Sequence, residues 1–202
     1  MIGFKILAIC GMLSPIIYTL MWVIGGFIVP EYNHLHKDIS SLFAVKAHRR
    51  WLFQSLIIAS SALMLVFFAG SHWGTNNGEG SIVGPILFII SAVMGLLVAC
   101  LFPLDEGGKP TAWRGKGHVV LVVSMGILQI VAMFFLFFSL RLVDGWKGFG
   151  IFNLVSAIVS LILVGVMSFF GGKPYMGLAE RFMASAYQIF YFVFALVVYF
   201  NN

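Results

Sequence analysis

Charged residues are scarce in this sequence. They make up 9% of the 202 residues, whereas soluble domains contain about 25%. Hydrophobic residues make up 61%, and the mean hydropathy is +1.03. A water-soluble fold of this length cannot cover so much apolar surface. The composition therefore excludes an ordinary soluble domain and indicates a protein embedded in a lipid bilayer.

Cysteine is also scarce, and the common catalytic motifs are missing. Cys10 and Cys100 are the two cysteines, and we expect them near opposite ends of different helices, too far apart for a disulfide. The sequence contains no CxxC, HExxH or GxSxG motif and no phosphate-loop or dinucleotide fingerprint. Nucleic acid is not expected as a partner, because the basic residues lie at a membrane surface.

Long apolar runs dominate what is present. Each run has about the 20 residues needed to cross a bilayer, and in lipid each must be helical, because unpaired backbone groups there are costly. We predict an all-α polytopic membrane protein, a single six-helix transmembrane domain over residues 1–202 with no soluble domain attached. The predicted helices are approximately 5–29, 51–70, 81–103, 118–140, 148–170 and 182–200.

No predicted helix carries Asp, Glu, Lys, Arg or His in its middle. Lys5 lies at the very start of the first helix. Ionisable groups inside a membrane usually mark ion pathways and proton relays. Their absence argues against a pump, a channel or a charge-coupled transporter.

Basic residues are distributed unequally between the two sides of the predicted bundle. Three of them, Lys5, Arg141 and Lys147, lie on the side of the termini. An excess of Lys and Arg marks the cytosolic side, so we expect a multi-pass protein of the cell (inner) membrane with both termini outside. Selection of these residues for a ligand would explain the same bias. The side of the first, third and fifth loops carries nine basic residues: Lys37, Lys46, Arg49, Arg50, Lys109, Arg114, Lys116, Lys173 and Arg181.

The first loop contains the densest polar stretch, "EYNHLHKDISS" at residues 31–41. In an extended chain, His34, His36 and Asp38 would share one side, which suggests a possible divalent metal site. Imidazole and carboxylate groups also suit acid–base catalysis, so His34, Asp105 and His118 are candidate catalytic residues. The alternative is that these histidines and carboxylates are exposed at the interface and hold no metal.

The second half of the first loop, "DISSLFAVKAHRRW", permits two structures. Asp38 is a good N-cap, and an apolar stripe follows it. This pattern is typical of a short interfacial helix, although an early start of the second helix explains it equally well.

Cations cluster where helices begin on this side. Arg49, Arg50, Arg114 and Arg181 lie close to predicted helix N-termini, which attract anions. Lipid head groups supply phosphate at this depth. Positive-inside topology alone would also account for these residues.

The topology brings several of these candidates to one level. Asp105 ends the predicted third helix, His118 opens the fourth, and Glu180 and Arg181 open the sixth. We predict that they converge with His34 in one polar pocket under the first loop. Asp105 is the expected bidentate partner of Arg181.

Three blocks, "YNHLHKDISSL", "LFPLDEGGKPTAWRGKGH" and "GLAERF", resemble the prokaryotic membrane family catalogued as domain of unknown function 998 (DUF998). The resemblance covers nearly the whole chain and implies six helices without a settled activity. The family tends to read Ile-Ser-Asp-Leu-Gly where this chain has Ser41 and Phe43. The family is distantly similar to the eukaryotic Frag/DRAM/Sfk group, which is linked to lipid handling. The positions that match the family pattern are Tyr32, Asn33, Ile39, Ser40, Asp105, His118, Glu180 and Arg181.

Two functions are compatible with this sequence. The first is binding or processing of a membrane lipid or other amphiphile at a polar site formed by the first, third and fifth loops. The alternative is a non-catalytic structural or regulatory subunit that docks a partner protein, with its polar residues spread over a convex surface. The expected ligand-binding residues are Tyr32, Asn33, Ser40, Arg49, Arg50, Arg114, Glu180 and Arg181.

Overall fold

The computed structural model describes residues 2–202, and its regular structure is helical throughout this range. All six long helices are long and apolar enough to cross a membrane. The prediction of an all-α, six-helix membrane protein is therefore confirmed. The long helices are α1 (Ile2–Ile28), α2 (Arg50–Gly74), α3 (Val83–Cys100), α4 (Trp113–Leu140), α5 (Lys147–Phe170) and α6 (Met176–Asn201), and the short 3-10 segments are η1 (Ser40–Phe43), η2 (Asn76–Gly78) and η3 (Glu106–Gly108).

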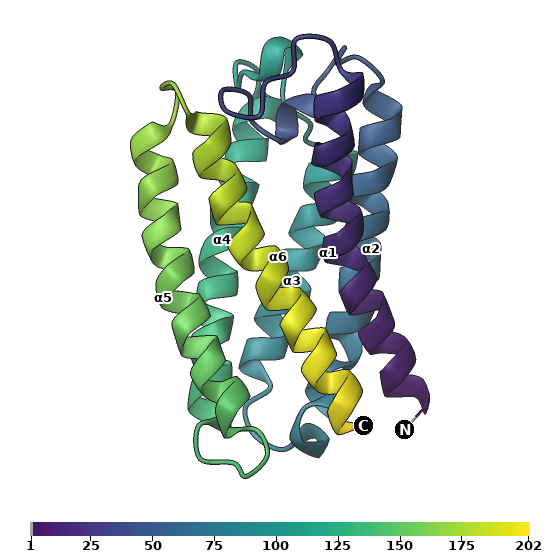
Figure 1. Ribbon diagram of the computed structural model, residues 1–202, viewed down its shortest axis with the longest axis vertical. Helices are drawn as coiled ribbons and strands as arrows, with labels where there is room; N and C mark the ends of the chain where they lie inside the picture. The colour runs from purple at the N-terminus through teal and green to yellow at the C-terminus, as the bar shows by residue number, and fades with distance from the viewer. Residues whose placement is uncertain (1) are drawn as a thin grey trace.

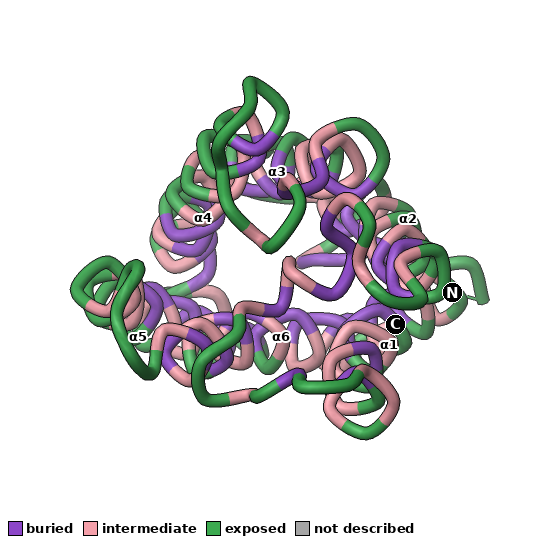
Figure 2. Tube along the Cα trace, turned by 90° about the horizontal axis from the view of Figure 1, so that it is seen from above, coloured by how far each residue is buried: buried purple, intermediate pink, exposed green. Residues whose placement is uncertain are grey.

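The six helices form a ring. Each packs against the next along the chain, and α6 closes the ring against α1 (Figure 2). Loop 1 (residues 29–49), loop 3 (101–112) and loop 5 (171–175) lie together at one end, called here the polar end. The two chain termini lie at the opposite end (Figure 1). The up-and-down topology thus gathers three loops on one side.

Aromatic rings fill much of the interior of the ring. Phe68 of α2 stacks on Phe88 of α3 with centroids 4.8 Å apart, and Phe88 stacks in turn on Phe190 of α6 at 5.6 Å. Phe152 of α5 lies nearly parallel to Phe190 at 6.0 Å. These contacts join four helices, and such pairs stabilise a core beyond their buried area.

Helices α4 and α6 begin earlier than predicted, at Trp113 and Met176 rather than at 118 and 182. The first two turns of each helix contain glycine and charged residues, which interrupt the apolar pattern that predicts a membrane span. As a result, His118 and Arg181 lie in the second helical turn and do not open their helices.

Neither expected structure of residues 38–50 is present. The segment forms the single turn η1, whose Leu42 and Phe43 are buried, and α2 begins only at Arg50. Lys46 and Arg49 adopt positive φ angles of 61° and 53°, which a right-handed helix cannot accommodate. The apolar side chains of this segment pack into the protein and do not form a stripe that faces lipid.

We predict that Gly11 is required for packing and that Gly165 is not. A Cβ atom on Gly11 would lie 2.6 Å from Phe67 Cγ and 2.8 Å from Ala195 Cβ, whereas one on Gly165 would meet nothing within 4 Å. Gly11→Ala should lower the stability of the detergent-solubilised protein by about 1–3 kcal/mol through overpacking. Gly165→Ala should leave stability unchanged or raise it, because alanine favours helix. Equal melting temperatures for the two variants would contradict this packing.

Candidate functional site

Arg181 is a buried cation that binds loop 1 to α6. Its side chain is 6% exposed. Nη1 donates to the carbonyl oxygens of His34 (2.7 Å), Lys37 (2.9 Å) and Gly177 (2.7 Å). Nε donates to His34 Nδ1 at 3.1 Å, and Nη2 donates to the hydroxyl of Tyr32. The planar fork of a guanidinium suits such a set of acceptors. All of them except Gly177 belong to loop 1.

Aromatic rings surround the same guanidinium. Arg181 Cζ lies 5.5 Å from the ring centroids of both Trp22 and Tyr32. The imidazole of His34 meets each of these rings edge-on, at 5.6 and 5.4 Å. Cation–π attraction therefore adds to the hydrogen bonds that hold Arg181.

Two glycines let loop 1 approach the helices closely. A Cβ on Gly26 of α1 would overlap the His34 ring, and one on Gly177 of α6 would overlap the carbonyl oxygens of His34 and Lys37. The N–H of Leu178 also donates to the carbonyl of Leu35 at 3.1 Å. Loop 1 thus lies directly on the backbones of α1 and α6.

Loop 1 also engages a carboxylate of α6. Glu180 Oε2 accepts the main-chain N–H of Ile39 at 2.6 Å. Within residues 2–202, the single ion pair joins Lys46 and Glu106, both exposed, at 2.7 Å. The positive charge of Arg181 is therefore balanced by carbonyl oxygens and aromatic faces and not by a carboxylate in direct contact.

The predicted pairing of Arg181 with Asp105 is wrong. Asp105 Oδ2 accepts from the Ala112 N–H at 2.6 Å and from Thr111 Oγ1 at 3.1 Å. Loop 3 therefore closes on its own carboxylate, aided by the positive φ of Gly107. Asp105 holds loop 3 at the start of α4 and does not reach α6.

Burial shifts the pKa of His34, Tyr32 and Asp38 in loop 1. It lowers the pKa of His34, and the nearby Arg181 cation lowers it further, so the imidazole stays a neutral acceptor for Arg181. Burial also raises the pKa of Tyr32, although Arg181 opposes that shift. The hydroxyl of Tyr32 can therefore donate to the Asp38 carbonyl at 3.0 Å. Burial raises the pKa of the Asp38 carboxyl, against the hydrogen bonds that Ser41 supplies.

His118 belongs to a second cluster. Its Nδ1 lies 2.7 Å from the carbonyl oxygen of Phe102 in loop 3, and its Nε2 lies 3.1 Å from Ser40 Oγ in loop 1. The imidazole is 4% exposed. His34, Asp105 and His118 therefore do not meet in one catalytic group, because each is bound in a different local network.

The three residues suggested for a metal are not brought together either. Asn33 O accepts the N–H groups of both His36 (3.1 Å) and Lys37 (2.8 Å), so this segment turns and is not extended. Its side chains therefore do not alternate as His34, His36 and Asp38 would in a strand. Within residues 2–202, no three His, Cys, Asp or Glu side chains form a group that could hold a metal ion.

The other predicted ligand-binding residues lie at the surface, in a turn or, for the partly buried Arg50, at the start of α2. Arg49 and Arg114 are exposed. The guanidinium groups of Arg50 and Arg114 lie 5.2 and 5.5 Å from the rings of the tryptophans next to them in sequence. Asn33 Oδ1 accepts the N–H of Leu35 at 2.8 Å, which stabilises the first turn of loop 1.

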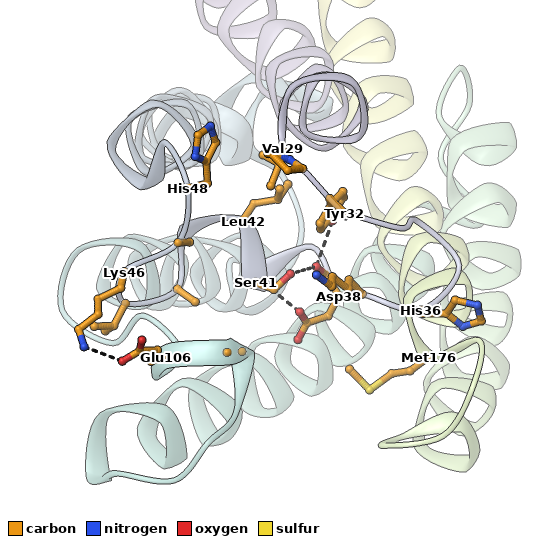
Figure 3. Close-up of a pocket in the computed structure, with 17 residues that line it drawn as sticks. Val29, Tyr32, His36, Asp38, Ser41, Leu42, Lys46, His48, Glu106 and Met176 are labelled. Atoms are coloured by element: carbon orange, nitrogen blue, oxygen red, sulfur yellow. Dashed lines mark hydrogen bonds and ion pairs between the residues drawn. The ribbon is translucent and has the colours of Figure 1, made fainter.

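A cavity of about 360 Å³ lies between loop 1, loop 3 and the start of α6. Figure 3 shows Asp38 and Ser41 at its centre and the pair of Lys46 and Glu106 at its rim. Its lining mixes apolar and ionisable side chains, which is typical of a site for a ligand with both characters. Apolar lining residues include Val29, Leu42 and Met176, and further polar ones include His36, Lys37 and His48.

The sequence profile of the family described as "Protein of unknown function (DUF998)" matches residues 12–197. The chain belongs to this family. Comparison with curated proteins and with solved structures gives no significant match.

The DUF998 positions listed above occupy distinct places in the structure. Tyr32 and Arg181 form the network that holds loop 1, and Glu180 extends it through Ile39. Ser40 and His118 form the second cluster. Asp105 and Asn33 stabilise turns in their own loops.

Three important residues of this DUF998 protein were not predicted from the sequence. Trp22 lies inside an apolar run and carries no polar signal, and Gly26 acts only through the space that it leaves for His34. Gly177 had a usable signal, because it precedes Arg181 by four residues, one helical turn. That spacing becomes informative only once α6 is known to begin at Met176.

We predict that Arg181→Lys destabilises the detergent-solubilised protein by about 3 kcal/mol or more, since hydrogen bonds to charged groups contribute about 1.5–3 kcal/mol each. Lysine cannot reproduce the donation to both His34 Nδ1 and Tyr32. Arg141→Lys is the matched control, because Arg141 is exposed and its guanidinium lies over the rings of Phe137 and Phe138. Thermal unfolding of the two variants should differ clearly, and similar curves would refute the bridging role of Arg181.

Proposed function

We propose that this membrane protein binds a phosphate-bearing lipid at its polar end, with the head group in the cavity between loops 1 and 3. The observation that carries the proposal is the mixed lining of that cavity beside the ends of two membrane helices. Val29 follows the last residue of α1, and Met176 is the first residue of α6. A ligand there can place its polar part against loop side chains and its apolar part in the bilayer.

The charges around the cavity favour an anionic head group. Lys46 is paired with Glu106, whereas Lys37 forms no ion pair among residues 2–202. His36 and His48 line the same space. Burial raises the pKa of the Asp38 carboxyl, and its Oδ1 already accepts the N–H of Ser41 at 3.0 Å. A phosphate group would find unpaired donors here, as in other basic pockets at membrane surfaces.

The geometry also bears on the alternative function. A docking module would spread its polar residues over a convex surface. Loops 1 and 3 instead enclose a cavity and are joined by a hydrogen bond from Val45 N to Leu104 O at 2.9 Å. A concave site with a fixed wall supports ligand binding better than it supports docking of a partner protein.

We also propose that the polar end faces the cytosol in the cell membrane and that both termini lie outside. The excess of lysine and arginine at the polar end supports this orientation. The lipid would then be taken from the cytosolic leaflet.

The lipid site predicts different effects for two exposed lysines of the polar end. Lys37 lines the cavity and Lys109 does not. Lys37→Glu should weaken binding of dioleoylphosphatidylglycerol by about fivefold or more, given about 1 kcal/mol for each basic residue near anionic lipid. Lys109→Glu should have a much smaller effect. Native mass spectrometry with titrated lipid measures both. Equal losses of affinity would indicate binding through non-specific surface charge. Unchanged affinity in both variants would contradict the proposed head-group site.

The proposed orientation can be tested with single cysteines in a Cys10→Ala, Cys100→Ala background. Glu79→Cys places a thiol in the loop between α2 and α3, and Ala112→Cys places one in loop 3, and both positions are exposed. A membrane-impermeant maleimide should label position 79 in intact cells and position 112 only after lysis. The reverse pattern would invert the orientation and leave the fold unchanged.

A further inference from the structure

Ser40 and His118 form a pair with the geometry of an activated nucleophile. The carbonyl oxygen of Phe102, 2.7 Å from His118 Nδ1, can only accept a hydrogen bond, so Nδ1 carries the proton. In the neutral imidazole, Nε2 is then the acceptor. Ser40 Oγ, at 3.1 Å, donates its proton to that nitrogen. A base oriented by a third group and bonded to a hydroxyl is the arrangement that activates serine.

We propose that Ser40 is a nucleophile, with His118 as its general base, in acyl transfer from an ester-linked lipid. The three groups come from separate elements: Ser40 begins η1, His118 lies in α4, and Phe102 belongs to loop 3. The carbonyl of Phe102 takes the orienting position that a carboxylate occupies in a Ser-His-Asp triad. Packing of the Phe43 ring 6.2 Å from the imidazole holds the base further.

Burial differs between the two partners in the way that this chemistry requires. His118 is 4% exposed, so water is largely kept from the base. Ser40 remains partly exposed and can meet a substrate. The next residue, Ser41, lines the cavity between loops 1 and 3. A lipid ester linkage lies between head group and tails, so a head group in that cavity brings its ester close to η1. The assignment of a lipid ester as substrate therefore rests on the proposed function.

The chemical step balances with water as the second substrate. Ser40 Oγ attacks the ester carbonyl while its proton moves to His118 Nε2. The C–O bond to the leaving alcohol then breaks, and His118 returns that proton to the alcohol. Water, activated by the same imidazole, cleaves the acyl-serine to a carboxylic acid and restores Ser40.

A fluorophosphonate probe tests the pair without a lipid, because it reacts with activated serines. In the folded protein, peptide mass spectrometry should locate the label on Ser40. Ser40→Ala should abolish it, and Ser55→Ala, at an exposed serine of α2 outside the cavity, should retain it. His118→Gln should slow labelling by about 100-fold, the scale of general-base catalysis. Absence of label on Ser40, or equal labelling in the His118→Gln protein, would overturn the proposal.

A second variant keeps the test decisive if His118→Gln does not fold. In a background with Cys10 and Cys100 replaced by alanine, Ser40→Cys should be alkylated by iodoacetamide faster than Ser41→Cys, because the imidazole stabilises the thiolate. An equal or slower rate at position 40 would count against the pair. The two proposals can fail separately. If Lys37→Glu binds lipid as well as the unchanged protein does, the proposed lipid site is wrong. If Ser40 is still labelled by the probe in that variant, the Ser40–His118 pair stands.

Discussion

The structure depends on a cation that is removed from water without a carboxylate in contact. An unpaired buried charge is very costly, so Arg181 must be surrounded by other acceptors. The protein supplies carbonyl oxygens of His34, Lys37 and Gly177, the Tyr32 hydroxyl and the face of Trp22. Because most of these groups belong to loop 1, the requirements of one guanidinium largely determine how that loop folds. A long polar loop thereby becomes a fixed wall at the end of the bundle.

The position of loop 1 in turn determines where Ser40 and the cavity-lining residues lie. Tyr32, held by Arg181, donates to the carbonyl of Asp38, and Glu180 accepts the N–H of Ile39. These two bonds lie immediately before η1, so they set where Ser40 begins its turn. The cavity and the contact of Ser40 with His118 both follow from that placement. In the structure Arg181 binds loop 1, and its expected contact with a ligand stays a prediction.

Much of the fold could be read from the sequence, because bilayer thickness and backbone hydrogen bonding leave few options for six apolar runs. Family membership and the gathering of loops 1, 3 and 5 on one side could also be predicted from the sequence. The hydrogen-bond partners of Arg181 and His118 could not. The sequence favours Asp105 as the partner of Arg181, because carboxylate side chains can be identified in a sequence. The groups that Arg181 binds are main-chain carbonyls, whose positions depend on the fold of loop 1. Pairing of Ser40 with His118 depends on a turn that is held by the bond from Ile39 to Glu180, 141 residues away in the sequence.

Closure of the ring between α1 and α6 has a consequence for biosynthesis. Loop 1 follows α1, yet the residues that fix it, Glu180 and Arg181, belong to α6, which is synthesised later. Loop 1 must therefore wait, unanchored, while four intervening helices are made and inserted. Folding of the polar end is tied to the arrival of α6, so a chain stalled before α6 would insert in the membrane with loop 1 unanchored.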